Sequence, residues 1–439
     1  MARFLVGSTA LTGHIVPLAP IVAELTDRGH QVLWYTGIHF QERVERAGAT
    51  FVPTRFAADD SHIPVNDRLP NRSRWTGIDS LLFDIRFLFA AESAGHFLDL
   101  QDIASKNRID AVLTDTGFLG GGWLYEAGGP PWAAFNPFAV NLSGEKIPPF
   151  GLGIAPPQTR LDHLRFAINQ STSWKHLYRD TTAYVDQLRQ RVGLPETGQI
   201  FWDRSLSPYL YMQGSIRGLE YERDDLPPQF HYIGPTVSQA IESPFEPPAW
   251  WTDTRNYART ILVTQGTLST DPHQLLLPTI RALASRNCLV IATTGGAPVE
   301  ELTQLRLPGN CRVVEYIPFE HVLPHVDLMI TNGGYNGVQL ALSHGVPLVV
   351  AGATEDKLEI NARIRRSGAG VDLGTSSPGP DSIRKAVMSI LAENSYRQRA
   401  GELSREFRRH NGAATGADLL EALARSRRPI LSQRNGVSI

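Results

Sequence analysis

Hydrophobic and polar positions in the first half of the chain alternate between two periods. Short apolar runs at residues 4–6 and 31–35 predict buried strands, and apolar residues at helical spacing within 15–25 predict an amphipathic helix. Pro17 and Pro20 are compatible with this helix if it begins near Pro17, because the first four N–H groups of a helix have no partner within it. Strand, helix and strand in this order predict a parallel sheet.

The same pattern continues along the chain and divides it into two α/β halves. Residues 227–251 hold the densest group of prolines together with Trp250 and Trp251, which is typical of a semi-rigid linker. We therefore predict an N-terminal domain at 1–225, a linker at 226–251, a C-terminal domain at 252–407, and a C-terminal helix and frayed tail at 408–439 that return to the N-terminal domain. Further strands are predicted at 50–52, 111–114, 260–264, 289–292, 312–315, 328–331 and 347–351, and further helices at 40–47, 382–391, 396–407 and 413–424.

Composition narrows the class of protein. A chain of 439 residues exceeds what one hydrophobic core usually supports, and 42% hydrophobic with 20% charged residues is ordinary globular usage. The net charge of -2 gives no global signal for nucleic acid. No apolar run approaches the ~18 residues of a membrane span, so we expect no stable membrane insertion. Only Cys288 and Cys311 occur, which favours the reducing cytoplasm.

Candidate chemistry in the first half follows two predicted strands. His14 comes after the first strand and Asp115 after the strand at 111–114, and the carboxyl ends of parallel strands meet at one edge of a sheet. A carboxylate beside a histidine fixes the tautomer of a general base and stabilises the imidazolium that forms. The alternative is structural: His14 binds a loop carbonyl or caps the helix, and Asp115 caps the helix that follows it.

Candidate chemistry in the second half consists of glycine-rich turns. Residues 331–338 follow a predicted strand and open a helix, and Gly266 with Thr267 follows another strand. Backbone N–H groups in such turns bind phosphate. Glu355 and Asp356 follow the strand at 347–351, and carboxylates accept hydrogen bonds from sugar hydroxyls, so the pattern suggests a sugar beside a diphosphate. A solvated charged loop is the alternative.

Apolar side chains in the irregular parts of the first half have two interpretations. Residues 81–89 are apolar at helical spacing, which is typical of a helix packed on a core and also of the wall of a ligand pocket. For the pocket hypothesis, the candidate wall residues are Leu11, Trp75, Leu82, Phe83, Phe87, Phe138 and Phe150.

Taken together, these motifs resemble the family 1 glycosyltransferases of the GT-B fold, most closely the bacterial branch that acts on natural products such as macrolide antibiotics. The resemblance rests on five motifs in a fixed order along the chain. They are a Gly-His-x-x-Pro segment, a Tyr-Ile-Pro-Phe turn, the turn at Asn332, a Gly-Val-Pro segment and Glu-Asp-Lys. It implies two facing, doubly wound Rossmann-like domains with a cleft between them. It also implies inverting, metal-independent transfer from a nucleotide sugar, with no cofactor.

The resemblance also implies roles for individual residues. His14 matches the general base and Asp115 the carboxylate that orients it, while Tyr316 and Ile317 match positions that hold the nucleotide base. The matches to the diphosphate and donor-sugar contacts are Thr267, Asn332, Gly333, Gly334, Asn336, Gly337, Val338, Glu355, Asp356 and Lys357. Relatives place histidine where this chain has Asn332, which cannot carry a positive charge, so we expect weaker diphosphate binding.

From these observations we predict a hexosyltransferase that moves glucose from UDP-glucose, or a sugar from a TDP donor, to a hydroxyl of a lipophilic natural product such as an antibiotic, forming a β-O-glycoside. Alternatives are a non-catalytic helper protein and a sugar-nucleotide epimerase or hydrolase. A dinucleotide fingerprint is missing from the sequence, which disfavours an oxidoreductase. Neither the acceptor nor the oligomeric state follows from the sequence.

Overall fold

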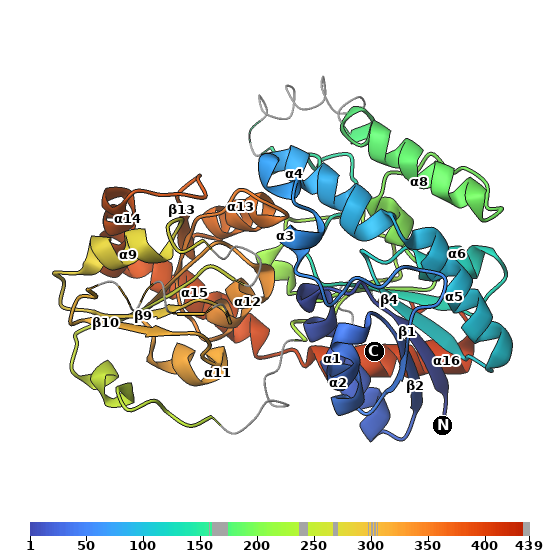
Figure 1. Ribbon diagram of the computed structural model, residues 1–439, viewed down its shortest axis with the longest axis horizontal. Helices are drawn as coiled ribbons and strands as arrows, with labels where there is room; N and C mark the ends of the chain where they lie inside the picture. Colours follow the sequence, from blue (N-terminus) through green and yellow to red (C-terminus); the bar gives the residue numbers. More distant parts are fainter. Residues whose placement is uncertain are drawn as a thin grey trace. The chain divides into compact units, whose positions relative to one another are not determined.

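The computed structural model describes residues 1–157, 159, 174–236, 245–266, 271–296, 298–299, 302, 304 and 306–432. The chain forms two compact units, Met1–Val237 with His410–Ile439, and Ser238–Arg409. Each unit contains one sheet, and helices pack on its strands (Figure 1). Every strand pair among the described residues is parallel, which confirms the predicted α/β class. No helix in these residues is long and apolar enough to cross a membrane.

The sheet of the first unit has seven strands in the order β3-β2-β1-β4-β5-β6-β7. The strands predicted at 4–6, 31–35, 50–52 and 111–114 are confirmed, whereas β5, β6 and β7 were not predicted. The bounds are β1 Arg3–Gly7, β2 Gln31–Tyr35, β3 Thr50–Val52, β4 Ala111–Asp115, β5 Trp132–Asn136, β6 Leu210–Gln213 and β7 Phe230–Tyr232.

The helices of this unit include one irregular segment. A π-helix at Ile85–Ala90 continues directly from α4, and such π segments are frequent at functional sites. The helix bounds are α1 Thr12–Asp27, α2 Gln41–Arg46, α3 Val65–Arg68, α4 Gly77–Asp84, α5 Ser93–Lys106, α6 Gly120–Glu126, α8 Arg179–Arg191 and α16 Gly412–Ser426.

Helix α1 begins earlier than predicted. The expected start near Pro17 is wrong: the helix begins at Thr12, so Pro17 and Pro20 lie inside it and each removes one internal hydrogen-bond donor. Burial of the apolar face offsets this loss, because Ile15, Leu18, Ile21, Val22 and Leu25 are all fully buried. The early start has a consequence for chemistry, since it places His14 in the first turn of the helix.

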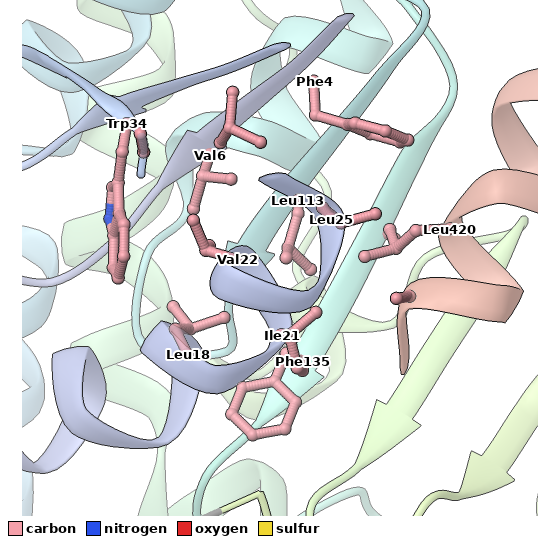
Figure 2. Close-up of a cluster of buried hydrophobic side chains, with 14 of the residues drawn as sticks. Phe4, Val6, Leu18, Ile21, Val22, Leu25, Trp34, Leu113, Phe135 and Leu420 are labelled. Atoms are coloured by element: carbon pink, nitrogen blue, oxygen red, sulfur yellow. The ribbon is translucent and has the colours of Figure 1, made fainter. Parts of the chain in front are cut away.

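The C-terminal helix α16 packs on this unit. Its residues Ala417, Leu420 and Leu423 belong to the same buried cluster as the apolar face of α1 (Figure 2). Polar contacts border the apolar ones: Arg28 Nη1 donates to Asp418 Oδ1 at 2.6 Å, and His30 Nε2 lies 2.8 Å from Glu421 Oε1. The chain therefore completes its first unit with residues from its far end.

Two predicted boundaries in this unit need correction. The predicted linker begins too early, because Phe230–Tyr232 lies within it and pairs with β6 as strand β7. This strand was not predicted, because its aromatic residues lie close to the proline cluster that was assigned to the linker. The tail is also not frayed up to Ser432, since Ile430 N donates to Tyr209 O at 2.8 Å and Ser432 N donates to Pro228 O at 2.6 Å. Backbone pairing with neighbouring loops orders these residues.

The second unit contains a six-stranded sheet in the order β10-β9-β8-β11-β12-β13. The five strands predicted in this half are confirmed within one residue, and the short edge strand β13 was missed. The strand bounds are β8 Thr260–Thr264, β9 Leu289–Thr293, β10 Cys311–Val314, β11 Leu328–Thr331, β12 Leu348–Val350 and β13 Gly370–Asp372. The helix bounds are α9 Leu276–Leu283, α11 Phe319–Val322, α12 Tyr335–Ser343, α13 Lys357–Ser367, α14 Pro380–Ala392 and α15 Asn394–Phe407.

Candidate active site

His14 and Asp115 form a buried pair at the carboxyl edge of the first sheet. His14 Nδ1 lies 2.7 Å from Asp115 Oδ1, and the two residues are 3% and 0% exposed. A carboxylate only accepts hydrogen bonds, so in the neutral imidazole this contact places the proton on Nδ1 and leaves the lone pair on Nε2. Nε2 has no partner in the part of the chain that the structure describes. In this geometry the carboxylate orients the imidazole, and Nε2 is the ring atom that could accept a proton.

Besides His14, Thr9 and Gly117 hold the carboxylate of Asp115. Its Oδ2 accepts from Thr9 N at 2.7 Å, and its Oδ1 accepts from Thr9 Oγ1 at 3.1 Å and from Gly117 N at 2.8 Å. Hydrogen bonds of this kind stabilise the ionised carboxylate in a buried site. A Cβ on Gly117 would lie 2.9 Å from His14 Cε1 and 3.0 Å from Asp115 Oδ1, so glycine leaves room for the pair.

Two aromatic rings contact the His14 imidazole. Phe138 is edge-on at a centroid distance of 5.0 Å, and Phe89 of the π-helix is tilted at 5.4 Å. The neighbouring Trp202 is fully buried and contacts Phe138 at 5.8 Å. These rings restrict the imidazole and would lie near the positive charge that it gains on protonation.

A second histidine close to this pair is structural. Burial lowers the pKa of His96 to about 4, against the opposing charges of Asp99 and Asp115. The hydroxyl of Tyr35 donates to Asp99 Oδ2 at 2.8 Å and lies 2.8 Å from His96 Nδ1. Asp99 also accepts hydrogen bonds from the backbone N–H groups of residues 55–57. This network therefore holds the loop after β3 in place.

The predicted acceptor-pocket residues fall into three environments. Phe150 is 2% exposed and packs on Trp202, so it belongs to the core. Phe138 and Leu11 lie at His14: the carbonyl of Leu11 accepts from His14 N at 2.9 Å. The remaining four are at least partly exposed, and three of them form a ladder in which Trp75 stacks on Phe83 at 6.4 Å and Phe83 contacts Phe87 at 4.6 Å. Leu82 is partly buried on α4.

The carboxyl edge of the second sheet repeats one turn three times. Strands β8, β9 and β11 end in Thr264, Thr293 and Thr331, which are register partners across the sheet. Each threonine hydroxyl accepts from the N–H of the glycine two residues later, at 3.4, 3.3 and 3.3 Å. Those three glycines, Gly266, Gly295 and Gly333, have φ of +76°, +74° and +90°. Only glycine adopts this conformation without strain.

Asn332 joins two of these turns. Its Nδ2 donates to the carbonyl of Gln265, while its Oδ1 is buried without a partner in the described residues. Asn361 is similar: its Nδ2 donates to Gly352 O at 3.0 Å, and its Oδ1 is unpartnered. A Cβ on Gly333 would lie only 2.3 Å from that Asn361 oxygen. Two buried acceptors without a partner in the described part of the chain therefore adjoin the glycine turn.

The carboxylate loop contains its own counter-charge. Lys357 is only 4% exposed, and its Nζ donates to Glu355 Oε2 at 2.7 Å and Thr354 Oγ1 at 3.1 Å. Glu355 has φ of 58°, a conformation that non-glycine residues rarely adopt. Strain of this type is typical of functional sites. Asp356 occupies the position before the first residue of α13.

The other nucleotide-sugar candidates follow strands β10 and β11 of the second unit. Gly334 precedes α12, and Asn336, Gly337 and Val338 lie in its first turns. Tyr316 is 55% exposed after β10, whereas Ile317 is buried. Thr267 lies outside the described residues. Within the described residues, no group of three His, Cys, Asp or Glu side chains is placed to hold a metal ion.

Comparison with known proteins identifies the family. Residues 280–419 match the model described as erythromycin biosynthesis protein CIII-like, C-terminal domain. The chain is 40% identical to 4'-demethylrebeccamycin synthase of Lentzea aerocolonigenes over 96% of this chain and 99% of that one. It belongs to the family 1 glycosyltransferases. A further relative is UDP-glucosyltransferase A1 of Starmerella bombicola, 29% identical over 94% of this chain and 90% of the relative.

Solved structures agree with this glycosyltransferase in fold. The calicheamicin glycosyltransferase matches with a TM-score of 0.71 at 20% identity, covering 97% of this chain and 99% of the other. The spinosyn rhamnosyltransferase solved with thymidine diphosphate matches with a TM-score of 0.68 at 19% identity, covering 95% and 100%. The predicted GT-B fold is thereby confirmed.

Several residues that contact the candidate site were not predicted from the sequence. Thr9, Asn136, Gln213 and Gln265 all contact the candidates above through hydrogen bonds. Asn136 and Gln213 end strands β5 and β6, which were themselves not predicted. A polar residue at the carboxyl end of a buried strand indicates a candidate site residue. Asn136 and Gln213 fit this pattern, but they could not be identified because their strands were not predicted.

Proposed function

We propose that this glycosyltransferase moves a hexose from a nucleotide diphosphate sugar to a hydroxyl of a lipophilic natural product, with inversion to a β-O-glycoside. The observation that carries the proposal is the buried His14–Asp115 pair, in which Nδ1 lies 2.7 Å from the carboxylate and Nε2 has no partner among the residues that the structure describes. Such a pair can accept a proton from an acceptor hydroxyl. UDP-glucose is the favoured donor, with a TDP sugar second.

The reaction balances as a single displacement. The acceptor hydroxyl gives its proton to His14 Nε2 while its oxygen forms a bond to the anomeric carbon of the donor. The bond from that carbon to the β-phosphate oxygen breaks, and its electron pair leaves with the nucleotide diphosphate. Asp115 stabilises the imidazolium, and its contacts to Thr9 and Gly117 hold it in place without solvent reorganisation.

The second unit would hold the donor. The turns at Gly266 and Gly333 present backbone next to α12, whose N-terminus carries the positive end of the helix dipole, and this favours the growing charge of the leaving diphosphate. Because hydroxyls donate hydrogen bonds, the unpartnered oxygens of Asn332 and Asn361 suit a ligand that also carries hydroxyl groups. We assign no metal to the reaction, and we place the enzyme in the cytoplasm.

The choice of substrates draws on the relatives. The Starmerella bombicola relative is named a UDP-glucosyltransferase, which supports UDP-glucose as the donor. The most similar relative quoted above is named 4'-demethylrebeccamycin synthase, which supports a natural product as the acceptor. The ladder of Trp75, Phe83 and Phe87, in which Trp75 and Phe87 are exposed and Phe83 is partly exposed, offers an apolar aromatic surface to such a molecule.

Thermal unfolding with UDP, TDP, GDP and NAD, each with and without chelator, tests the donor. A ligand at 100 times its Kd stabilises a protein by about 2.7 kcal/mol, which raises Tm by several degrees. We expect UDP to give the largest shift and chelator to leave it unchanged. A shift with NAD alone contradicts the proposal, and loss of the UDP shift in chelator contradicts metal independence.

Product analysis then separates transfer from the alternatives. Incubation of UDP-glucose with hydroxylated aromatic acceptors should yield UDP and a β-glucoside in equal amounts. UDP release without glycoside would indicate a hydrolase, and nucleotide binding without any turnover would indicate a helper protein.

A further inference from the structure

Two uncharged amides meet at the carboxyl ends of β5 and β6. Asn136 and Gln213 are the last residues of these strands and are register partners. Both are fully buried, and Asn136 Nδ2 donates to Gln213 Oε1 at 2.8 Å. A buried amide is costly unless its polar atoms are paired, so the geometry of this pair is strongly constrained.

The remaining atoms of the two amides hold the backbone of Phe138 from both sides. Phe138 N donates to Asn136 Oδ1 at 3.2 Å, and Phe138 O accepts from Gln213 Nε2 at 2.7 Å. Thr116 Oγ1 donates to the same Asn136 oxygen at 2.8 Å. The backbone of Phe138 is therefore positioned by side chains from two strands.

The ring of Phe138, whose backbone the two amides hold, contacts His14, the proposed base. It stands edge-on to the imidazole of His14, with an interplanar angle of 79° and a centroid distance of 5.0 Å. Phe89 contacts another part of the imidazole at 5.4 Å. The hydrogen bond to Asp115 fixes one atom of the ring, and the aromatic contacts restrict its rotation about that atom.

We propose that Asn136 and Gln213 are positioning residues for glycosyl transfer, which act through Phe138 to hold His14 Nε2 toward the acceptor hydroxyl. This inference rests on the proposed function of His14. Neither amide titrates, so the support is equally present at every pH at which the enzyme works. A misplacement near 1 Å can cost about a hundredfold in rate.

A Gln213→Met variant tests this role, because methionine has a similar shape and removes both hydrogen bonds. We expect kcat to fall about tenfold or more, while KM for the donor changes less than twofold. Ser207→Ala is the matched control: Ser207 is fully buried before the amino end of the same strand, and its hydroxyl donates to the carbonyl of Trp132. The control should lower Tm without lowering kcat. Equal falls of kcat in both variants would overturn the proposal.

A double-mutant cycle tests the route through Phe138. In a Phe138→Ala background, Gln213→Met should reduce kcat by less than twofold, because the ring through which it acts is already gone. If Gln213→Met causes the same fall in kcat with and without Phe138, the route is wrong. Gln213→Asn, which is too short to reach both partners, replaces Gln213→Met if the methionine variant does not fold.

A spectroscopic measurement separates failure of this inference from failure of the proposed function. The Cε1–H signal of His14 in an NMR spectrum of ¹³C-labelled protein can be assigned by its loss in a His14→Gln variant. Phe138→Leu, which removes the ring current of residue 138, is the positive control and should shift this signal. Gln213→Met should also shift it, because a displaced Phe138 ring changes the ring-current field at His14. An unmoved signal in folded Gln213→Met overturns the positioning role, even if the enzyme transfers sugar. Absence of transfer by the wild type, with the shift observed, overturns the proposed function alone.

Discussion

The carboxyl edges of the two sheets differ in how their buried polar groups are paired. At the edge of the first sheet, the buried carboxylate is surrounded by partners: Asp115 accepts from the backbone N–H groups of Thr9 and Gly117 and lies within 3.1 Å of the side chains of Thr9 and His14. At the edge of the second sheet, glycine turns expose the backbone, and the buried Oδ1 atoms of Asn332 and Asn361 have no partner among the described residues. Both edges belong to parallel sheets, so the difference lies in the residues and not in the topology.

The difference indicates which edge is complete before substrates bind. Buried polar groups are normally paired, and two unpaired oxygens beside one glycine turn are positions where a ligand or water can supply the missing hydrogen bonds. Under the proposed function, the His14 edge is preorganised for proton transfer and lacks only the acceptor hydroxyl at Nε2. Under the same proposal, the Asn332 edge would gain hydrogen bonds when a donor binds. Variants that disturb the first edge should therefore affect kcat, whereas variants that disturb the second should affect donor binding.

The largest expected effect comes from breaking the His14 edge. His14→Ala should lower kcat by about 10³-fold, since a positioned general base contributes 10² to 10⁴. Asp115→Asn should have a similar effect, because an amide can donate to Nδ1 and leave the wrong tautomer. Transfer kinetics measure the loss, and the Tm shift with UDP should persist in both variants. A fully active His14→Ala variant would contradict the assigned role.

The next effect concerns acid stability of the first unit. A histidine in an unfolded chain has a pKa near 6.5, whereas burial lowers the pKa of His96 to about 4. Between these values the unfolded state binds more protons, so stability falls as pH decreases from about 6.5 to about 4, by up to about 3 kcal/mol.

Denaturant unfolding at several pH values measures this dependence. A His96→Gln variant should lose less stability on acidification than the wild type. The exposed His39→Gln variant is the control and should follow the wild type. Parallel curves for wild type and His96→Gln would show that His96 does not contribute.

A smaller effect is expected at the glycine turn. Gly333→Ala places a Cβ at φ of +90° and 2.3 Å from Asn361 Oδ1, so the turn must move. We expect KM for the donor to rise about tenfold, equivalent to about 1.4 kcal/mol. Gly309→Ala, where a Cβ meets nothing within 4 Å, is the matched control in the same unit. An unchanged KM in Gly333→Ala would mean that this turn does not bind the donor.

The smallest effects distinguish two glycines at the first edge. Gly117→Ala would crowd His14 and Asp115 at 2.9 and 3.0 Å, and we expect about a fivefold lower kcat as these side chains shift. Gly13→Ala places its Cβ in open space on α1 and should raise stability by about 0.5 kcal/mol with kcat unchanged. Thermal unfolding measures the stability of both variants, and transfer assays measure their kcat. If Gly117→Ala has the same kcat as Gly13→Ala, the site does not require glycine at position 117.

The local pattern of the sequence was enough for much of this description. Strands such as β1 and β8 are short apolar runs bounded by polar or glycine residues. Their presence and their burial could therefore be predicted. The position of His14 and Asp115 after two such strands predicted that they would share an edge. Strands β5, β6 and β7 were missed, because aromatic and small residues near them did not form a recognisable period.

By itself, the sequence determined two parallel α/β units, the candidate base with its carboxylate, and the glycine turns, since these depend on residue type and short-range spacing. Only the tertiary structure decided which neighbours complete them. Phe138 lies against His14 because Asn136 and Gln213, 77 residues apart, end adjacent strands and hold its backbone. Contacts of this kind arise from strand register and side-chain packing between distant segments, which no local pattern encodes.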